Sequence, residues 1–364
     1  MEHKERMLAA LDRREPDMVP IWELAFNEPS IVGIARHFVE EDKLPPVKMV
    51  MDYDDVEKFK LIGGLIAFTR ALDLDGVTAI GLAPRQRLSD TLLRDAFGVV
   101  NHVSDFGEPM PIQGPIKDAA DLRAYNMRAP AEGDFLLLNV LRAALPERAA
   151  VFHLQETFKI SWSLRGAMQN LLMDYILNPQ LAHDLARVTT DYTLAVVEIA
   201  IKKGADAIVM DGDLAFNPGP IMSPAHYDEF IGPYHKEIVT LAHRHGLKIF
   251  KHSDGNLTPL IPNLIAAGFD GIHPIQPQCM DIGETKARFG DRLAILGNID
   301  CSFLLVTGSE AEVREAVRET IRRAAPGGGY VISSSNSIHP GVKPENYIAL
   351  ARAAREFGRY PIAL

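Results

Sequence analysis

The sequence of 364 residues has few cysteines, few tryptophans, no long apolar run and no excess of positive charge. Its two cysteines, Cys279 and Cys301, cannot build a disulfide framework, so packing must stabilise the fold. No apolar stretch reaches the roughly 18 residues that a membrane span needs, and the charged N-terminal segment has no apolar signal region. The 38 Lys and Arg against 48 Asp and Glu give a net charge of −10, which repels a phosphate backbone. We therefore expect a cytoplasmic protein that acts on a small molecule, with no nucleic-acid or membrane partner.

Apolar residues make up 47% of the chain and charged residues 24%, which is typical of a globular protein with a large core. Short runs of apolar or β-branched residues recur along the chain and predict strands that are buried on both faces, as in a parallel sheet. The eight predicted strands are residues 19–22, 77–82, 150–154, 207–210, 248–251, 271–275, 294–296 and 330–333.

Longer segments with apolar residues at helical spacing lie between these runs, and several end at a glycine. The clearest are residues 181–203, 224–245 (with Ser223 as the N-cap), 257–267 and 310–325. Alternating helices and buried strands predict an α/β fold: one (β/α)₈ TIM barrel over residues 1–364, with an N-terminal helical extension. Residues 88–117 are rich in Gly and Pro and interrupt the alternation. We interpret them as an insertion or hairpin after the second strand, with a short strand at 99–103, that serves as a lid or an oligomer contact.

A barrel of this kind carries its chemistry at the carboxyl ends of its strands, and polar residues follow nearly every predicted strand. We predict catalytic roles for Glu23, Glu156 and Asp211, because a buried carboxylate is costly unless it is paired or functional. Predicted substrate-binding residues come from the same strand ends: Asp213, Gln276, Asn298, Asn336 and His339.

The densest polar cluster is residues 251–256. In an extended segment residues i and i+2 point the same way, so His252 and Asp254 can bind one cation. The alternative is that Asp254 caps the next helix while His252 bonds a neighbour, since two ligands do not complete a site. Asp211 and Asp213 leave a similar choice between binding a cation, binding a cationic substrate and lining a solvated turn.

The chain resembles the uroporphyrinogen decarboxylase-like superfamily, and within it the corrinoid methyltransferase branch that includes methylcobamide:coenzyme M methyltransferases. The motifs that carry the resemblance are residues 6–11, 16–20, 219–224, 252–256, 297–300, 336–340 and 344–346. True uroporphyrinogen decarboxylases bind substrate carboxylates through an N-terminal arginine-rich segment. The matching residues 20–27 read PIWELAFN and contain no arginine, which disfavours a porphyrinogen substrate.

The methyltransferase branch binds zinc through a His-x-Cys motif and a later Cys. His252 matches the His of that motif, Asp254 stands at the position of its Cys, and the later Cys falls close to Asn336. The loss of both thiolates shifts the preference towards nitrogen and oxygen ligands. The resemblance thus implies a Zn²⁺ site of His252 and Asp254, completed by another strand-end acid such as Glu156 or Asp211.

The leading hypothesis is a corrinoid-dependent methyltransferase that moves a methyl group between a methylcorrinoid protein and a small acceptor or methoxylated donor. No DxHxxG motif occurs in the chain, so the corrinoid must be supplied in trans by a separate protein. Coenzyme M, tetrahydrofolate and an O-demethylation pathway stay open as routes. The alternatives are a cofactor-free decarboxylase or lyase of a small aromatic acid, with Asp211 or Glu23 as the acid/base, and a non-catalytic binding barrel. Both a monomer and a homodimer are compatible with the sequence.

Overall fold

The computed structural model describes residues 1–48, 52–104 and 109–363. Its central element is a curled, fully parallel sheet of seven strands, which lie in the order β1-β6-β7-β10-β11-β12-β13. These strands are β1 (Gly76–Ile80), β6 (Ala149–Gln155), β7 (Ala207–Asp211), β10 (Lys248–His252), β11 (Gly271–His273), β12 (Ala294–Leu296) and β13 (Tyr330–Val331). Each coincides with one of the predicted apolar runs.

The predicted first strand, residues 19–22, joins the two edges of this sheet although it forms only isolated bridges. Ile21 pairs in parallel with Ile332, beyond the end of β13. On its other side, the carbonyl oxygen of Ile21 accepts a hydrogen bond from the backbone N–H of Asp75, just before β1. The segment therefore closes the ring, and the predicted barrel-like α/β fold is confirmed.

Alternate side chains of the strands point into the barrel, as the two-residue period of a strand requires. Among them are Trp22, Val151, Val209 and Phe250, which form a buried apolar cluster inside the ring. Helix α1 (His3–Leu11) adds Met7, Ala10 and Leu11 to this cluster and closes the amino end of the barrel. The predicted N-terminal helical extension is therefore a plug.

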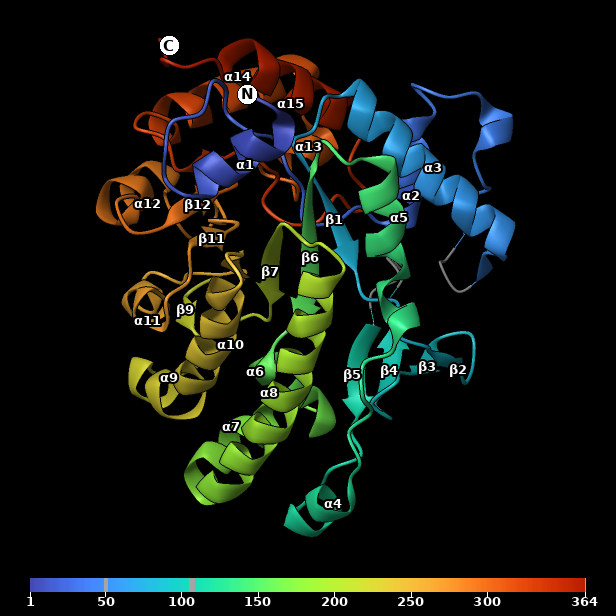
Figure 1. Cartoon of the computed structure of the whole chain (residues 1–364), viewed down its shortest axis with the longest axis vertical. Coiled ribbons are helices and arrows are strands. Elements are labelled where there is room, and N and C mark those ends of the chain that lie inside the picture. Colours follow the sequence, from blue (N-terminus) through green and yellow to red (C-terminus); the bar gives the residue numbers. More distant parts are fainter. Residues whose placement is uncertain (49–51, 105–108, 364) are drawn as a thin grey trace.

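The remaining helices are α2 (Glu28–Ala35), α3 (Asp55–Ala71), α4 (Ala119–Ala124), α5 (Leu136–Ala144), α6 (Thr157–Leu164), α7 (Met168–Leu177), α8 (Pro179–Lys202), α9 (Pro224–Phe230), α10 (Gly232–Arg244), α11 (Ile261–Ala267), α12 (Ile282–Phe289), α13 (Leu304–Thr307), α14 (Glu310–Ala324) and α15 (Pro344–Phe357), with short 3₁₀ turns η1 (Glu41–Lys43) and η3 (Glu132–Phe135). Most of these helices surround the barrel and pack on its outer side, whereas α4 lies beyond the four-stranded sheet of the predicted insertion and α7 packs against α6 and α8 (Figure 1). Among the described residues, no helix combines the length and apolar character needed to cross a bilayer.

Two helix predictions need correction. The segment 224–245 forms α9 and α10 rather than one helix, because Pro233 lacks an N–H and disfavours a helical residue before it. The predicted cap Ser223 is confirmed, since its hydroxyl accepts a hydrogen bond from the backbone N–H of His226. The segment 257–267 becomes helical only at Ile261, after a turn.

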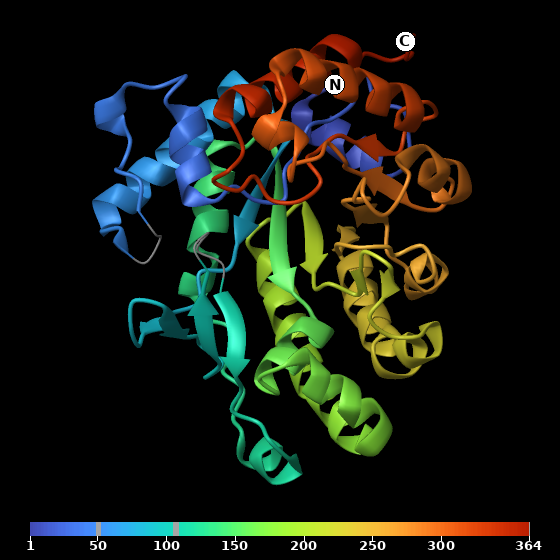
Figure 2. The same ribbon diagram turned by 180° about the vertical axis from the view of Figure 1, so that it is seen from behind.

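The predicted insertion forms a four-stranded antiparallel sheet, in the order β2 (Gln86–Arg87), β3 (Leu92–Arg94), β4 (Val100–Val103) and β5 (Pro109–Gln113). Residues 105–108 of the predicted insertion lie outside the described part of the chain. A two-stranded ribbon, β8 (Ala215–Phe216) and β9 (Gly219–Pro220), follows β7. The four-stranded sheet and the helices α6–α9 stand on two sides of the end towards which β6 and β7 point, whereas both termini lie near the opposite end (Figures 1 and 2). The role of the insertion as a lid or an oligomer contact stays a prediction.

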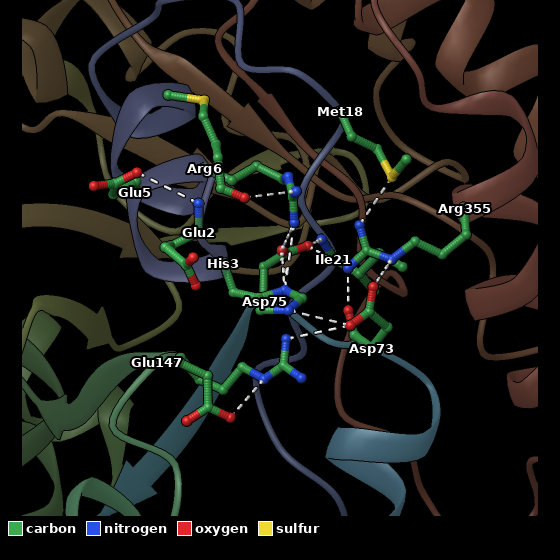
Figure 3. Close-up of polar contacts among 12 residues, drawn as sticks. Glu2, His3, Glu5, Arg6, Met18, Ile21, Asp73, Asp75, Glu147 and Arg355 are labelled. Atoms are coloured by element: carbon green, nitrogen blue, oxygen red, sulfur yellow. Dashed lines mark hydrogen bonds and ion pairs between the residues drawn. The ribbon is translucent and has the colours of Figure 1, made fainter.

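A buried carboxylate, Asp75, joins the segments that meet where residues 19–22 close the barrel beside β1. It accepts hydrogen bonds from Arg6 Nη1 (2.6 Å), Arg355 Nη2 (2.7 Å) and the backbone N–H of Ile21 (2.8 Å), and its Oδ1 lies 2.9 Å from His3 Nδ1 (Figure 3). These groups come from α1, the closing segment and α15. Burial alone would raise the pKa of Asp75, but the hydrogen bond with His3 and the charges of Arg355 and Arg6 hold it below its usual value.

We predict that Asp75→Asn lowers the free energy of unfolding by about 1.5–3 kcal/mol at neutral pH, because it removes the buried anion that Arg6 and Arg355 share and leaves each guanidinium only its outer partner, Asp17 or Asp73. A lowered pKa in the folded state contributes stability above the unfolded-state value near pH 4, and that contribution is lost as the pH falls further. Urea unfolding at pH 7 and at pH 3.5 measures both effects. The difference in the free energy of unfolding between variant and wild type must be smaller at pH 3.5 than at pH 7. Asp291→Asn, at an exposed carboxylate, is the matched control. An equal loss at both pH values would contradict the assignment.

Candidate active site at the carboxyl end of the barrel

Polar side chains form a layer directly above the apolar interior of the barrel. His153, Asp211 and His252 each lie two residues beyond an inward-facing residue of their own strand, and so point inward themselves. His273 lies against the inward-facing ring of Trp22. In the strand register Asp211 is paired with His252, and His252 with His273. The carboxyl end of the barrel is therefore lined by imidazoles and carboxylates, as catalytic barrels of this type require.

Within this layer, ligand atoms of Asp211, Asp213 and His252 all lie within 4.8 Å of one another. The Nε2 atom of His252 is 3.7 Å from Asp211 Oδ1, while His153 Nε2 approaches Asp211 Oδ2 at 3.4 Å. Burial alone would raise the pKa of Asp211, but the hydrogen bond and charge of His153 and the charges of His252 and Lys251 hold it well below its usual range. Asp211 is therefore an anion.

A chain of hydrogen bonds determines which nitrogen of His252 is free. Ser333 Oγ donates its one proton to the carbonyl oxygen of Ser334 (2.9 Å), so it must accept from His273 Nε2 at 3.1 Å. A neutral His273 then accepts at Nδ1 from His252 Nδ1, 2.8 Å away. Burial lowers the pKa of both imidazoles, which favours this neutral pair. His252 Nε2 consequently carries a lone pair and faces the two carboxylates.

One imidazole nitrogen and two carboxylates suit a divalent cation that accepts nitrogen and oxygen ligands, including Zn²⁺. The second imidazole orients the first, as the hydrogen-bonding partner of a metal-binding histidine does. The predicted ligand His252 belongs to this cluster, and so does Asp211, the strand-end acid predicted to complete the site. Asp213, predicted to bind substrate, takes the place expected for Asp254.

Asp254 lies beside this cluster and holds its loops together. Its backbone N–H donates to Asp213 Oδ1 (2.9 Å), and its own Oδ2 accepts from Asn336 Nδ2 (2.6 Å). Asp254 therefore positions Asp213 and is itself positioned by the predicted substrate-binding residue Asn336. Its role as a direct ligand stays a prediction.

Glu156 lies behind the polar layer. It caps α6, accepting from the backbone N–H groups of Phe158 (2.6 Å) and Lys159 (3.3 Å), and its Oε2 accepts from His235 Nε2 (2.7 Å). Gly212 covers it, since a Cβ there would lie 2.1 Å from Oε1. Burial would raise the pKa of Glu156, yet His235 and Lys251 lower it, so the group is an anion. This placement favours a positioning role over contact with a reactant.

Glu23 points away from the barrel interior, because its neighbours Trp22 and Leu24 point into it. Its carboxyl group meets the backbone N–H (2.9 Å) and the hydroxyl (2.7 Å) of Ser334, and it lines a cavity of about 530 Å³ between β1, α3 and α5. Burial raises the pKa of Glu23 to about 8 against these hydrogen bonds. Glu23 is therefore a neutral acid at pH 7. It lies outside the ring of barrel strands, whereas Asp211 lies inside it. The expectation that both line one pocket does not agree with this geometry.

The other predicted substrate-binding residues tie loops at the same end. Gln276 Oε1 accepts from the backbone N–H of Gly255 (2.8 Å), and Asn298 Nδ2 donates to the carbonyl oxygen of Ile275 (2.7 Å). His339 Nε2 lies 3.0 Å from the carbonyl oxygen of Cys301. His153 and His273 also follow predicted strands, but the sequence analysis assigned them no role, although counting inward positions in steps of two along β6 and β11 places both in the polar layer.

The comparisons with known proteins show the family. The family model described as "Uroporphyrinogen decarboxylase (URO-D)" matches residues 95–357, so the chain belongs to this family. A protein named uroporphyrinogen decarboxylase from Thioalkalivibrio sulfidiphilus is 24% identical, covering 97% of this chain and 98% of its own. Another from Coxiella burnetii is 27% identical and covers 74% of this chain and 76% of its own.

Among solved structures, a methyltransferase from Methanosarcina mazei superposes with a TM-score of 0.73 at 18% identity, covering 98% of this chain and 99% of that one. At that identity the match shows the fold alone. The sequence-based assignment to the superfamily is confirmed, and the chain is a member of an enzyme family.

We predict that metal-depleted protein binds one divalent cation through Asp211, Asp213 and His252. Asp213→Asn should weaken Zn²⁺ binding by at least about tenfold more than Asp254→Asn, because only the first removes a ligand from the cluster. Isothermal titration with Zn²⁺ and Mn²⁺ measures this difference. A larger loss of Zn²⁺ affinity with Asp254→Asn than with Asp213→Asn would instead support His252 and Asp254 as the ligands, as expected from the sequence.

The hydrogen-bond chain predicts that His273→Phe weakens cation binding by about 10–100-fold without unfolding the protein. Phe keeps an aromatic ring against Trp22, whose ring centroid lies 5.3 Å from that of His273, but it cannot accept the proton of His252 Nδ1. Titration of the variant, with a thermal melt as the folding control, tests it. Unchanged affinity in a folded variant would show that His273 does not orient His252.

Proposed function

We propose that this protein is a methyltransferase that moves a methyl group between a small methylated molecule and a corrinoid held by a separate protein. The observation that carries the proposal is the cluster of Asp211, Asp213 and His252, with an unprotonated nitrogen facing two carboxylates at the carboxyl end of the barrel. Such a cluster attracts a cation. It repels the carboxylates of a porphyrinogen, and the arginine-free segment 20–27 offers no compensating charge.

The chain's own residues supply binding and proton handling. Asp211, Asp213 and His252 would hold Zn²⁺ or another divalent cation, which when bound supplies Lewis-acid polarisation of a substrate oxygen. His153 lies next to Asp211 and is placed to hold or donate a proton at the oxygen from which the methyl group departs. Asp254 and Asn336 keep the acidic loop in position.

The corrinoid belongs to a partner in this proposal. The chain has no DxHxxG motif, so none of its own residues matches the usual ligand to cobalt. A corrinoid supplies a cobalt centre that accepts or donates the methyl group. The four-stranded sheet and α6–α9 stand on two sides of the barrel's carboxyl end (Figure 1), where Asp213 is exposed, and in this proposal the separate domain docks at that end.

A second candidate, decarboxylation of a small acid without a cofactor, is favoured by one observation. Glu23, with its pKa raised to about 8, is a protonated carboxyl group at neutral pH and can protonate a carbanion. Several relatives carry the name decarboxylase. Glu23, however, faces the outer cavity rather than the polar layer, which makes this the weaker candidate.

We predict that the protein loaded with Zn²⁺ methylates free cob(I)alamin from at least one donor in a panel of aryl methyl ethers, methylamines and methyl thioethers. Asp211→Asn should slow the reaction at least about 100-fold, because it removes a cation ligand and the partner of His153. The absorbance change of the corrinoid measures the rate, and Asp291→Asn is the control. Release of CO₂ from an aromatic acid without corrinoid, and no methylation from any donor, would support the decarboxylase instead.

A further inference from the structure

A second pocket adjoins the polar layer, between the four-stranded sheet and the strands β1 and β6. Its volume is about 240 Å³, and His153 and Gln155 line it. His153 also approaches Asp211, so this one residue joins the pocket to the polar layer, although Asp211, Asp213 and His252 do not themselves line the pocket. This volume is below the roughly 300–1,000 Å³ of pockets for drug-sized ligands, so it accommodates a single substituted ring rather than a tetrapyrrole.

Two pairs of aromatic rings form the walls of this pocket. Phe135 and Phe152 are stacked with ring centroids 5.2 Å apart, and Phe97 meets Tyr192 edge to face at 5.1 Å. Aromatic walls in these geometries favour a planar aromatic ligand, which gains both burial and ring–ring contact.

The same pocket is lined by two cations, Lys159 and Arg85, that form no ion pair with any described residue. Lys159 Nζ lies 4.3 Å from the centroid of the Trp162 ring, which orients it without neutralising it. Their side chains come from different elements, α6 and the loop after β1, and meet at one cavity. Two unpaired cations beside aromatic walls constitute a site for an anion.

The acids that line the pocket do not supply that anion. Asp134 is already paired with Arg128 at 2.8 Å and 3.2 Å. Asp95 accepts hydrogen bonds from the backbone N–H groups of Phe97 and Val99 and from the Asn101 amide, and the charge of Arg85 counters part of the rise that burial causes in the pKa of Asp95, without a direct ion pair between the two described residues. Lys159 and Arg85 are therefore available to a ligand.

The geometry points to a single-ring aromatic carboxylate as the substrate class. Its carboxylate lies between Lys159 and Arg85, its ring lies between the two aromatic pairs, and its methylated substituent points towards His153 and Asp211. Guanidinium and ammonium groups form charge-assisted hydrogen bonds with a carboxylate, and these select the acid over its neutral analogue. The placement of the methylated substituent towards His153 and Asp211 rests on the proposed function. Binding of the aromatic acid in the pocket does not require methyl transfer.

Isothermal titration of the full-length protein with 4-methoxybenzoate, methoxybenzene and cyclohexanecarboxylate tests the inference. We expect 4-methoxybenzoate to bind at least about tenfold more tightly than either analogue, since each lacks one half of the recognition. Lys159→Met and Arg85→Met should each weaken binding of the acid at least about tenfold and leave binding of methoxybenzene unchanged. Arg94→Met, at an exposed arginine of β3 outside the pocket, is the matched control and should bind like wild type.

Equal affinity for 4-methoxybenzoate and methoxybenzene, or unchanged affinity in both cation variants, would overturn the inference. Binding of 4-methoxybenzoate without methylation of cob(I)alamin would support the pocket and count against the methyltransferase. Methylation from a neutral or cationic donor, with no binding of the acid, would leave the methyltransferase standing and remove the aromatic acid as its substrate.

Discussion

The buried carboxylate of Asp75 is the interaction on which the geometry of the barrel depends. It holds the backbone N–H of Ile21 against β1 and joins α1 to α15 through Arg6 and Arg355. Once Ile21 is held, the next residue, Trp22, must point into the barrel, where its ring lies edge to face with His273 at 5.3 Å. His273 in turn orients His252. An ion cluster at the amino end of the barrel is thus connected, through one strand, to the ligand set at the carboxyl end.

The composition of the polar layer follows from the alternation of inward and outward side chains along each strand rather than from any single motif. An apolar layer of Val151, Val209 and Phe250 excludes water below, so a charge in the layer above must be compensated by its neighbours. Asp211 meets His153 and His252, and Asp213 lies within 4.8 Å of both Asp211 and His252. The layer then holds a neutral His252 and an ionised Asp211, which are the states in which an imidazole and a carboxylate bind a divalent cation.

The fold could be predicted from the sequence because strands buried on both faces appear as continuous apolar runs, and each strand of the seven-stranded sheet coincided with such a run. The site was predicted less well. The residues that follow a strand are visible in a sequence, but the wall of the barrel decides on which side each one lies. Glu23 and Asp211 both follow strands, yet Glu23 faces an outer cavity. Likewise Asp213 and Asp254 follow neighbouring strands, and only loop geometry assigns one to the cluster and the other to its support.

The buried charges behind the site show why Glu156 is ionised although it is fully buried. Lys251 is fully buried, and its Nζ donates to the carbonyl oxygens of Gly212 (2.5 Å), which lies between the two acids of the cluster, and of His252 (2.7 Å), which belongs to the cluster. Burial lowers the pKa of Lys251, whereas the charges of Glu156 and Asp211 raise it. Glu156 thus supplies negative charge behind Lys251, and Asp211 supplies it in front. If Asp211 were the only carboxylate near Lys251, the positive charge of Lys251 would offset part of the attraction of Asp211 for a bound cation. With Glu156 behind it, Lys251 holds the loop by its carbonyl groups while Asp211 keeps its charge directed towards the mouth of the barrel.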